Sequence, residues 1–241
     1  GLPDIGLAAL GEMAAGIADI VAATGLPVSV DGDDGYGDAK SVIHMVELYA
    51  RMGVSSIVLE DQVRVSKQPG DSGALAVVSV DAMARKIAAA KGADGGDAIQ
   101  LVARCDAYQL EGLAGAVRRA EAYLKAGADG IFIPAVPTVA ELAEIGRNFR
   151  GNHLMNAMFE GRKTWLPPSE YYAMGFNHVV FPGAVISRVV DATTSALRQL
   201  GDFAAGSSTM TPLSDAASVQ SALEEAVQFD KWKAAHKRYA E

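Results

Sequence analysis

The sequence has 241 residues, of which half are apolar and 21% are charged, the balance of an ordinary globular protein. Its net charge of −8, from 21 basic and 29 acidic residues, disfavours nucleic acid as a partner because phosphate binding needs a basic surface. No apolar run approaches the about 20 residues of a membrane span, so we expect no membrane partner. The single cysteine, Cys105, excludes an internal disulfide and indicates a reducing compartment, the cytoplasm.

Helical patterns alternate with short apolar runs through most of the chain. The apolar runs predict strands at 27–33, 56–60, 98–104, 130–134, 153–158 and 178–182. The helical patterns predict helices at 7–24, 38–52, 80–91, 111–126, 138–149 and 168–174. Continuous apolar strands are typical of parallel sheets that are buried on both faces, so this alternation predicts a parallel α/β fold.

The number of strands leaves two α/β architectures open. Six strands fit a doubly wound sheet, whereas a (β/α)8 TIM-type barrel needs eight. The chain opens Gly-Leu-Pro-Asp-Ile-Gly without an initiator methionine, which reads as a loop inside a domain. We therefore expect a barrel whose N-terminal strands precede this sequence.

Residues 62–79 interrupt the alternation with a segment rich in Gly, Ser and Gln. A plain surface loop is one interpretation. The length of the segment, and its position directly after an acidic strand end, favour an active-site lid.

The C-terminal part departs from the alternating pattern. A helix is predicted beyond residue 188, then a Gly/Ser/Thr stretch at 206–214 and a last helix at 215–238. We predict a barrel domain at 1–205, followed by a linker and packing helix at 206–241. The apolar side of the last helix must be buried on the barrel or on a partner subunit, and we expect a homodimer or homotetramer.

Charged and polar residues follow four predicted strands, at the ends where parallel barrels carry their sites. They are Asp31 and Asp33, Glu60 and Asp61, Arg104 and Asp106, and Asn156 and Glu160. Clustered carboxylates repel one another unless a cation lies between them, and hard oxygen ligands suit Mg²⁺ or Mn²⁺. An arginine beside them suits a substrate carboxylate. Any one acid could equally be a solvated loop residue, but three charged strand ends together favour a metal site.

The remaining reactive side chains give weaker signals. Cys105 has no histidine partner nearby in the sequence, so we expect it to be buried and inert rather than a nucleophile. The histidines lack metal-ligand spacing, and His153 and His178 open strands at the end opposite the expected site. Glycines among the acids at 31–37 imitate a dinucleotide loop, but the acids would repel a pyrophosphate.

Three motifs together resemble the isocitrate lyase/phosphoenolpyruvate mutase superfamily. They are Asp31-Gly-Asp-Asp-Gly-Tyr-Gly37, Leu59-Glu-Asp-Gln62 and Ala103-Arg-Cys-Asp-Ala107. Segments 1–6, 126–130 and 158–161 fit the same pattern in the same order, so the resemblance covers essentially the whole chain.

The resemblance implies a (β/α)8 barrel with Mg²⁺ at the strand ends and a last helix exchanged between subunits. It implies that Asp31 binds the metal directly, with Asp33, Glu60 and Asp4 around it, partly through water. Arg104 would hold a substrate carboxylate. The expected catalytic residues are thus Asp31, Arg104 and Glu60, and the expected metal ligands are Asp31, Asp33 and Glu60. The expected substrate-binding residues are Asp4, Tyr36, Arg104, Asn156 and Glu160.

Two departures from the superfamily bear on the substrate. Isocitrate and methylisocitrate lyases carry a Lys-Lys-Cys-Gly-His lid whose cysteine is the general acid, whereas residues 65–73 contain neither Cys nor His. Those lyases also have a glutamate where Ala135 follows Ile133-Pro134. Both differences count against isocitrate and methylisocitrate. The lid also lacks the Lys-x-Asn of phosphonopyruvate mutases, for which Lys67 and Gln68 are distant substitutes.

The sequence therefore predicts a Mg²⁺-dependent lyase of a small 2-oxo or 2-hydroxy di- or tricarboxylic acid. It would cleave a carbon–carbon bond, or decarboxylate, through a metal-stabilised enolate. A phosphonopyruvate mutase or hydrolase and a non-catalytic acid-binding barrel are the alternatives.

Overall fold

The computed structural model describes residues 2–68, 73–207, 209, 212 and 214–240. Of the predicted lid, residues 69–72 lie outside these described residues. The chain divides into two compact units, residues 1–183 and 184–241. This division comes earlier in the chain than the predicted boundary between residues 205 and 206.

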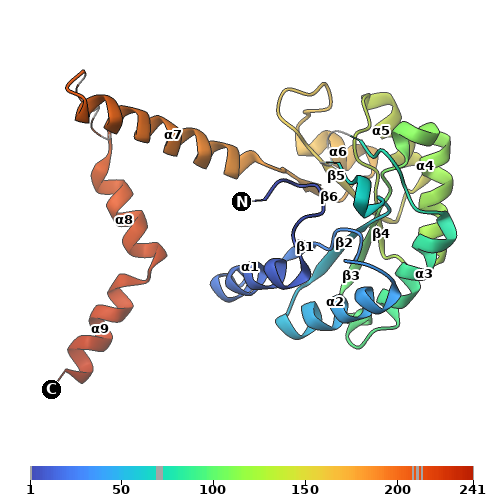
Figure 1. The fold of residues 1–241 in the computed structure, drawn as a ribbon, viewed down its shortest axis with the longest axis horizontal. Coiled ribbons are helices and arrows are strands. Elements are labelled where there is room, and N and C mark those ends of the chain that lie inside the picture. The colour runs from blue at the N-terminus through green and yellow to red at the C-terminus, as the bar shows by residue number, and fades with distance from the viewer. Residues whose placement is uncertain (1, 69–72, 208, 210–211, 213, 241) are drawn as a thin grey trace. The chain divides into compact units, whose positions relative to one another are not determined.

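In its described part, the first unit is built on one parallel sheet whose six strands follow one another in chain order (Figure 1). The strands are β1 (Ser29–Asp31), β2 (Ser56–Glu60), β3 (Gln100–Arg104), β4 (Gly130–Phe132), β5 (His153–Ala157) and β6 (His178–Val180). Each strand pairs in parallel with the next. The sheet curves as a partial TIM-type barrel, so the parallel α/β prediction is confirmed.

Several strands end earlier than the sequence predicted. The predicted runs 130–134 and 178–182 both finish in a proline, which has no N–H to donate to a neighbouring strand. β4 and β6 accordingly end two residues before these prolines, at Phe132 and Val180. β1 ends at Asp31 because the next residues form a tight turn, in which the Gly35 N–H donates to the Gly32 carbonyl over 2.9 Å.

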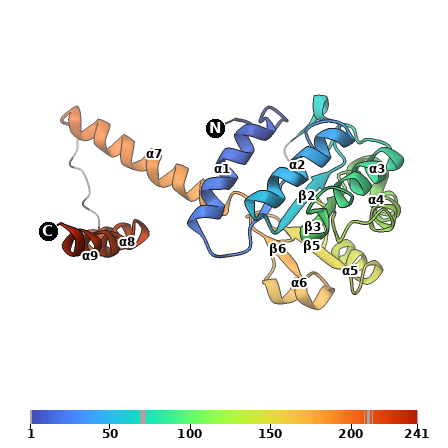
Figure 2. The same cartoon turned by 90° about the horizontal axis from the view of Figure 1, so that it is seen from below.

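Helices connect the strands and cover one face of the sheet, as Figure 2 shows for α2, α3, α4 and α5. They are α1 (Leu10–Ala23), α2 (Ala39–Met52), α3 (Val80–Lys91), α4 (Tyr108–Lys125), α5 (Val139–Asn148) and α6 (Pro168–Met174). Among the described residues, two short 3₁₀ helices, η1 (Arg64–Ser66) and η2 (Gly96–Ala98), lie in the connections. Helices adjacent in the chain contact one another, so each βα unit packs beside the next.

Local sequence signals explain where several of these helices begin and end. The Asp38 side chain caps α2 and the Ser79 hydroxyl caps α3 by accepting hydrogen bonds from first-turn N–H groups. Gly53 and Gly175 end α2 and α6 in the left-handed conformation that favours glycine. These ends confirm the helix–glycine–strand pattern predicted from the sequence.

The sheet separates two apolar clusters. The larger one fills the space between the strands and the helices and includes Ile57, Leu101, Ile131 and Leu154. The smaller one lies on the concave face and consists of Val58, Val102, Phe132 and Met155. Alternate residues of one strand therefore enter different clusters, so the strands are buried on both faces as predicted.

The second unit consists of helices α7 (Ala184–Ala204), α8 (Ala216–Ala226) and α9 (Phe229–Tyr239) in its described part. The prediction of one helix over 215–238 was wrong, because Gln228 has a φ of 53° and its left-handed backbone separates α8 from α9. Asp215 caps α8 by accepting from the Ser218 N–H over 3.0 Å. Exchange of the last helix between subunits stays a prediction. Among the described residues, no helix has both the length and the apolar character needed to cross a membrane.

Candidate active site

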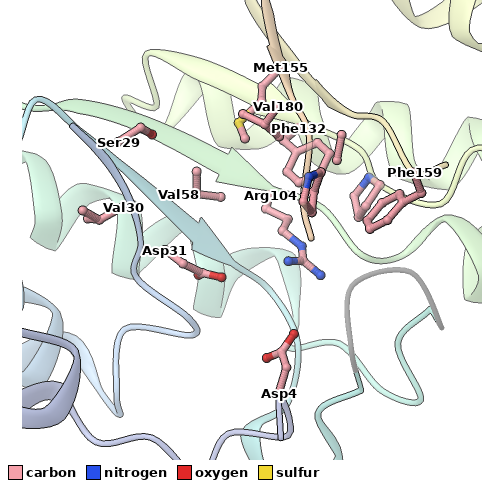
Figure 3. A pocket seen from close by; sticks show the side chains of 13 residues that line it. Asp4, Ser29, Val30, Asp31, Val58, Arg104, Phe132, Met155, Phe159 and Val180 are labelled. Atoms are coloured by element: carbon pink, nitrogen blue, oxygen red, sulfur yellow. The ribbon is translucent and has the colours of Figure 1, made fainter. Parts of the chain in front are cut away.

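A cavity of about 360 Å³ opens at the carboxyl ends of the strands in the first unit (Figure 3). Its polar wall is formed by Asp4, Asp31 and Arg104, whose charged groups point toward one another. The rest of the lining is mostly apolar: Ser29, Val30, Val58, Phe132, Pro134, Met155, Ala157, Phe159, Val180 and Pro182. The cavity thus brings charge and an apolar wall together in a space the size of a small organic ligand.

The loop after β1 holds Asp31 in place through a tight turn. The Asp33 N–H donates to the Asp31 Oδ1 over 2.8 Å, which fixes the carboxylate on the cavity wall. A Cβ at Gly32 would lie 2.8 Å from the Ile57 side chain, so only glycine fits there. Asp33 and Tyr36 have positive φ values of 48° and 59°, a conformation that is uncommon for residues with a side chain and that recurs at functional sites.

Asp34, the third acid of this loop, has a structural role. The Arg64 Nε donates to its Oδ1 over 2.8 Å, and the Lys86 Nζ donates to its backbone carbonyl over 2.6 Å. Arg64 also donates to the Gly6 carbonyl over 2.7 Å. Asp34 therefore ties the loop to the segment that carries Asp4.

Glu60, at the end of β2, is a buried carboxylate with poor compensation. Its side chain is 1% exposed, and neither carboxylate oxygen has a hydrogen bond in the structure. The Lys67 Nζ and the Arg104 Nη1 each lie 3.2 Å from one of its oxygens. Burial raises the pKa of Glu60 to about 8, against the lowering effect of Arg104. The carboxylate would therefore gain from a further cation.

Arg104, at the end of β3, is held rigidly by Asp106. The Arg104 Nε and Nη2 donate to the two Asp106 carboxylate oxygens over 2.9 and 2.7 Å. This paired geometry fixes the plane of the guanidinium, and Arg104 still lines the cavity. The remaining N–H groups can meet a planar carboxylate that enters from the cavity.

Asp61 lies on the opposite side of the sheet and supports Arg104 indirectly. Its Oδ1 accepts from the Asp106 N–H over 2.8 Å, and its Oδ2 accepts from the Tyr123 hydroxyl over 2.6 Å. The Arg119 Nη1 lies 3.6 Å from the same Oδ2. Burial raises the pKa of Asp61 to about 6, although the Tyr123 and Asp106 hydrogen bonds lower it. Asp61 thus anchors the turn that carries Asp106.

The sequence analysis considered Lys67 only as a distant substitute in the Lys-x-Asn lid motif. The structure places its ammonium among the acids. It forms ion pairs with Asp33 and, over 3.0 and 3.2 Å, with Asp4 and Glu60. Burial lowers the pKa of Lys67, but the carboxylates of Glu60 and Asp33 raise it by more, so the pKa lies above its ordinary value. A lysine near an acidic strand end was visible in the sequence, but its partners depend on the path of the loop.

The predicted site residues fall into three groups. Asp31, Arg104 and Asp4 line the cavity. Asp33 and Glu60 lie behind them and are joined to Asp4 through Lys67. The third group, Tyr36, Asn156 and Glu160, neither lines the cavity nor pairs with Lys67.

Tyr36, Asn156 and Glu160 are not among the residues that line the cavity. The Tyr36 ring lies under the Arg64 guanidinium, and the Arg64 Cζ is 5.2 Å from the centroid of the ring. Asn156 is buried, and its side-chain amide donates to the Ala157 carbonyl over 3.3 Å. Glu160 is exposed in the loop after β5. Asn156 follows Met155, which faces the cavity, so strand alternation turns it toward the helices.

The apolar wall was not predicted from the sequence. Phe132, Met155 and Val180 lie in strands that read as continuous apolar runs, which do not distinguish the two faces of the sheet. Counting back in steps of two from Glu60 and Arg104 would have identified Val58 and Val102 as residues of the concave face.

The acids of the site suit a divalent cation that keeps most of its water. Within the described part of the chain, no three Asp, Glu, His or Cys side chains are close enough to enclose a metal ion. Mg²⁺ does not require such a cage, because it commonly binds one or two carboxylates and completes its shell with water and substrate. Asp31 on the cavity wall and the buried, hydrogen-bond-free Glu60 behind it fit this mode.

Cys105 and the paired histidines lie away from the cavity lining. Cys105 is fully buried, and its Sγ donates to the Ala116 carbonyl over 3.8 Å. Burial raises the pKa of this thiol well above its ordinary value, so the structure confirms a buried cysteine and supports its expected inertness. His153 and His178 begin β5 and β6, with the ring nitrogens Nε2 and Nδ1 3.4 Å apart.

Comparisons with known proteins agree with these motifs. The family model of phosphoenolpyruvate phosphomutase matches residues 1–201. The 2-methylisocitrate lyase of Aeropyrum pernix is 35% identical over 199 residues, which are 83% of this chain and 64% of that protein. The 2,3-dimethylmalate lyase of Eubacterium barkeri is 38% identical over 186 residues, 77% of this chain and 64% of that protein.

A solved structure of oxaloacetate acetylhydrolase with the inhibitor 3,3-difluorooxalacetate matches with a TM-score of 0.88 and 26% identity. The match covers 100% of this chain and 80% of that one. The chain spans 64% of the length of each of the two curated relatives.

Proposed function

Because this chain belongs to the phosphoenolpyruvate phosphomutase family, we propose that it is a divalent-metal-dependent lyase of a small 2-oxo or 2-hydroxy carboxylic acid. The observation that carries this proposal is the convergence of Asp31, Asp4 and Arg104 on one cavity at the strand ends. The names of the three relatives refer to methylisocitrate, dimethylmalate and oxaloacetate, which supports a carboxylic acid as substrate.

In the proposed reaction, Arg104 pairs with a substrate carboxylate through the N–H groups that Asp106 leaves free. Asp31 would hold Mg²⁺, for which Mn²⁺ can substitute, and Asp33 and Glu60 would act on the ion through water. The metal, when bound, supplies the positive charge that polarises the substrate oxygen next to the breaking bond. The apolar wall of Phe132, Met155 and Val180 excludes water from the departing carbon group.

The proton that ends the reaction must come from water or from a lid residue. Cys105 is the single cysteine of the sequence, and it is buried away from the cavity lining. The chain therefore lacks the thiol acid of methylisocitrate lyases, so we favour oxaloacetate over methylisocitrate. The 38% identity to the 2,3-dimethylmalate lyase makes a dimethylmalate-like acid the next substrate to test. Loss of CO₂ from oxaloacetate makes the smallest demand on an acid in the lid.

An assay of the purified chain against a panel of acids tests this proposal. The panel contains oxaloacetate, 2,3-dimethylmalate, 2-methylisocitrate and phosphonopyruvate, with Mg²⁺ or with EDTA. We expect Mg²⁺-dependent turnover of one of the first two. Because Mg²⁺ also promotes decarboxylation of oxaloacetate in solution, the Asp31→Ala variant serves as the blank. No turnover of any acid, together with no effect of EDTA, would contradict the proposal.

The family model itself favours one second candidate, a phosphonopyruvate mutase or hydrolase that breaks a phosphorus–carbon bond. Release of phosphate from phosphonopyruvate, or its conversion to phosphoenolpyruvate, would support this candidate. Thermal stabilisation by an acid without product would instead support a barrel that binds but does not turn over its ligand.

We also propose that the chain acts as a homodimer or homotetramer, with helices of the second unit exchanged or packed between subunits. Large apolar side chains are exposed on these helices, including Ile186 and Phe203 on α7 and Trp232 on α9. Such a surface is typical of an interface. Light scattering coupled to size-exclusion chromatography measures the assembly, and a monomer would contradict this part of the proposal.

A further inference from the structure

Lys67 lies where a buried cation is needed, and the chain holds it there from both sides. Lys67 is 4% exposed, and its backbone N–H donates to the Arg64 carbonyl over 3.2 Å at the end of η1. The next residue, Gln68, donates from its N–H to the Gln62 Oε1 over 3.1 Å. The Gln62 side-chain amide donates back to the Gln68 carbonyl over 3.3 Å. The ammonium is therefore directed into the acid cluster by a fixed segment of backbone.

The partners of Lys67 are carboxylates that the proposed metal also needs. Its ammonium pairs with Asp33 and lies 3.2 Å from the Glu60 Oε1 and 3.0 Å from the Asp4 Oδ1. Asp31, the proposed direct ligand, is joined to Asp33 by the 2.8 Å hydrogen bond from the Asp33 N–H. A divalent ion at Asp31 and the Lys67 ammonium would therefore draw on one set of negative charges.

Two positive charges that draw on the same carboxylates repel one another strongly when both are shielded from water. The same acids cannot compensate both cations fully, and Glu60 is already without a hydrogen bond. Binding of the metal must then be weaker than it would be without the lysine, and the pairing of Lys67 must weaken when the metal binds.

We propose that Lys67 is a tethered cation that shares Asp33 and Glu60 with the divalent metal and sets the affinity of the site for that metal. This inference rests on the proposed function, since it takes a metal at Asp31 as given. In the absence of metal, Lys67 keeps the acids from repelling one another. When metal binds, at least one carboxylate turns from the ammonium toward the ion or its water.

Titration with Mn²⁺, followed by calorimetry or by electron paramagnetic resonance, tests the proposal on the full chain. Lys67→Met removes the competing charge, so we expect it to bind Mn²⁺ about tenfold or more tightly than the wild type. Lys67→Arg keeps the charge and should stay within about threefold of the wild type.

Lys86→Met is the matched control, because the Lys86 Nζ donates to the Asp34 carbonyl and lies 3.7 Å from the Asp34 Oδ2, so its partner is the acid of this loop that is not a proposed metal ligand. It removes one lysine charge next to the same loop, so it should stay within about threefold of the wild type. Equal Mn²⁺ affinities in the wild type and Lys67→Met, or weaker binding in Lys67→Met, would overturn the proposed role of Lys67. The proposed metal-dependent function would still stand. If neither protein binds Mn²⁺, the proposed metal-dependent function fails as well.

A second measurement uses the wild type and does not depend on the folding of a variant. Acetic anhydride labelling, read for each lysine by peptide mass spectrometry, should modify buried Lys67 far more slowly than exposed Lys40. Addition of Mn²⁺ should increase the labelling rate of Lys67 severalfold and leave Lys86 unchanged. An unchanged or slower rate at Lys67 with saturating Mn²⁺ would overturn the shared-carboxylate proposal.

Discussion

Glu60 and Asp61 are neighbours in the chain, yet they lie on opposite faces of the same sheet and have opposite characters. Glu60 faces the concave side, its carboxylate has no hydrogen bond, and it forms ion pairs with Lys67 and Arg104. Asp61 faces the helices and has its oxygens bonded to Asp106 and Tyr123. The comparison indicates that the inner face carries incompletely compensated charge for chemistry, whereas the outer face carries completed networks that support it.

The largest expected effect separates two buried arginines. Arg104→Met removes the inner cation, and we expect kcat/KM to fall about a hundredfold or more, because charge-assisted hydrogen bonds to a substrate carboxylate are lost. Arg119→Met, on the outer face, is the matched control: it should lower stability but leave kcat/KM of the folded protein within about fivefold. Steady-state kinetics measures kcat/KM of both variants. Equal losses of kcat/KM would contradict the distinction between the two faces of the sheet.

The next effect concerns the outer network. Asp61→Asn takes away the charge that accepts from Tyr123 and Asp106, and we expect a loss of about 1–3 kcal/mol in the free energy of unfolding. Urea unfolding measures it, with Asp94→Asn on the exposed surface as the control. A variant as stable as the wild type would show that the network is dispensable.

The third effect is a pH dependence of the inner carboxylate in metal-free protein. Burial raises the pKa of Glu60 from its ordinary value of 4.5 to about 8 in the folded state. Because the folded pKa is the higher one, Glu60 contributes its full stability below pH 4.5 and loses it as the pH rises toward about 8. Relative to Glu60→Gln, the wild type should therefore lose about 1 kcal/mol or more over that range. Urea unfolding in EDTA checks this, and a constant difference with pH would contradict it.

The smallest effect is expected at the thiol. Cys105→Ala on the outer face should cost about 1 kcal/mol of stability, because it leaves a small cavity. It should leave kcat/KM within about twofold, because the thiol is fully buried and is not among the residues that line the cavity. Loss of activity without loss of folding would make Cys105 part of the chemistry and reverse its assignment.

The parts of the fold set by local sequence were predictable. β2 over 56–60, α3 over 80–91 and α6 over 168–174 have the predicted bounds, because caps, glycines and prolines fix their ends. The break at Gln228 was not predictable, since glutamine carries no signal for a left-handed backbone.

The site was partly predictable for a similar reason. Asp31 and Arg104 stand at strand ends, and the position of strand ends follows from the pattern of the whole chain. Lys67 and Asn156 could not be placed, since the first depends on where a loop folds back and the second on which strand face meets the cavity. The two faces of a buried parallel strand have the same apolar character in sequence.

The division of labour among the strands has a consequence for redesign. The cavity charges at strand ends come from β1 and β3, whereas Phe132, Met155 and Val180 come from β4, β5 and β6. The size of the accepted acid can therefore be varied by a small library at these three positions without altering the charged groups. Gly32 should be held constant in any such library, because every side chain there would collide with Ile57.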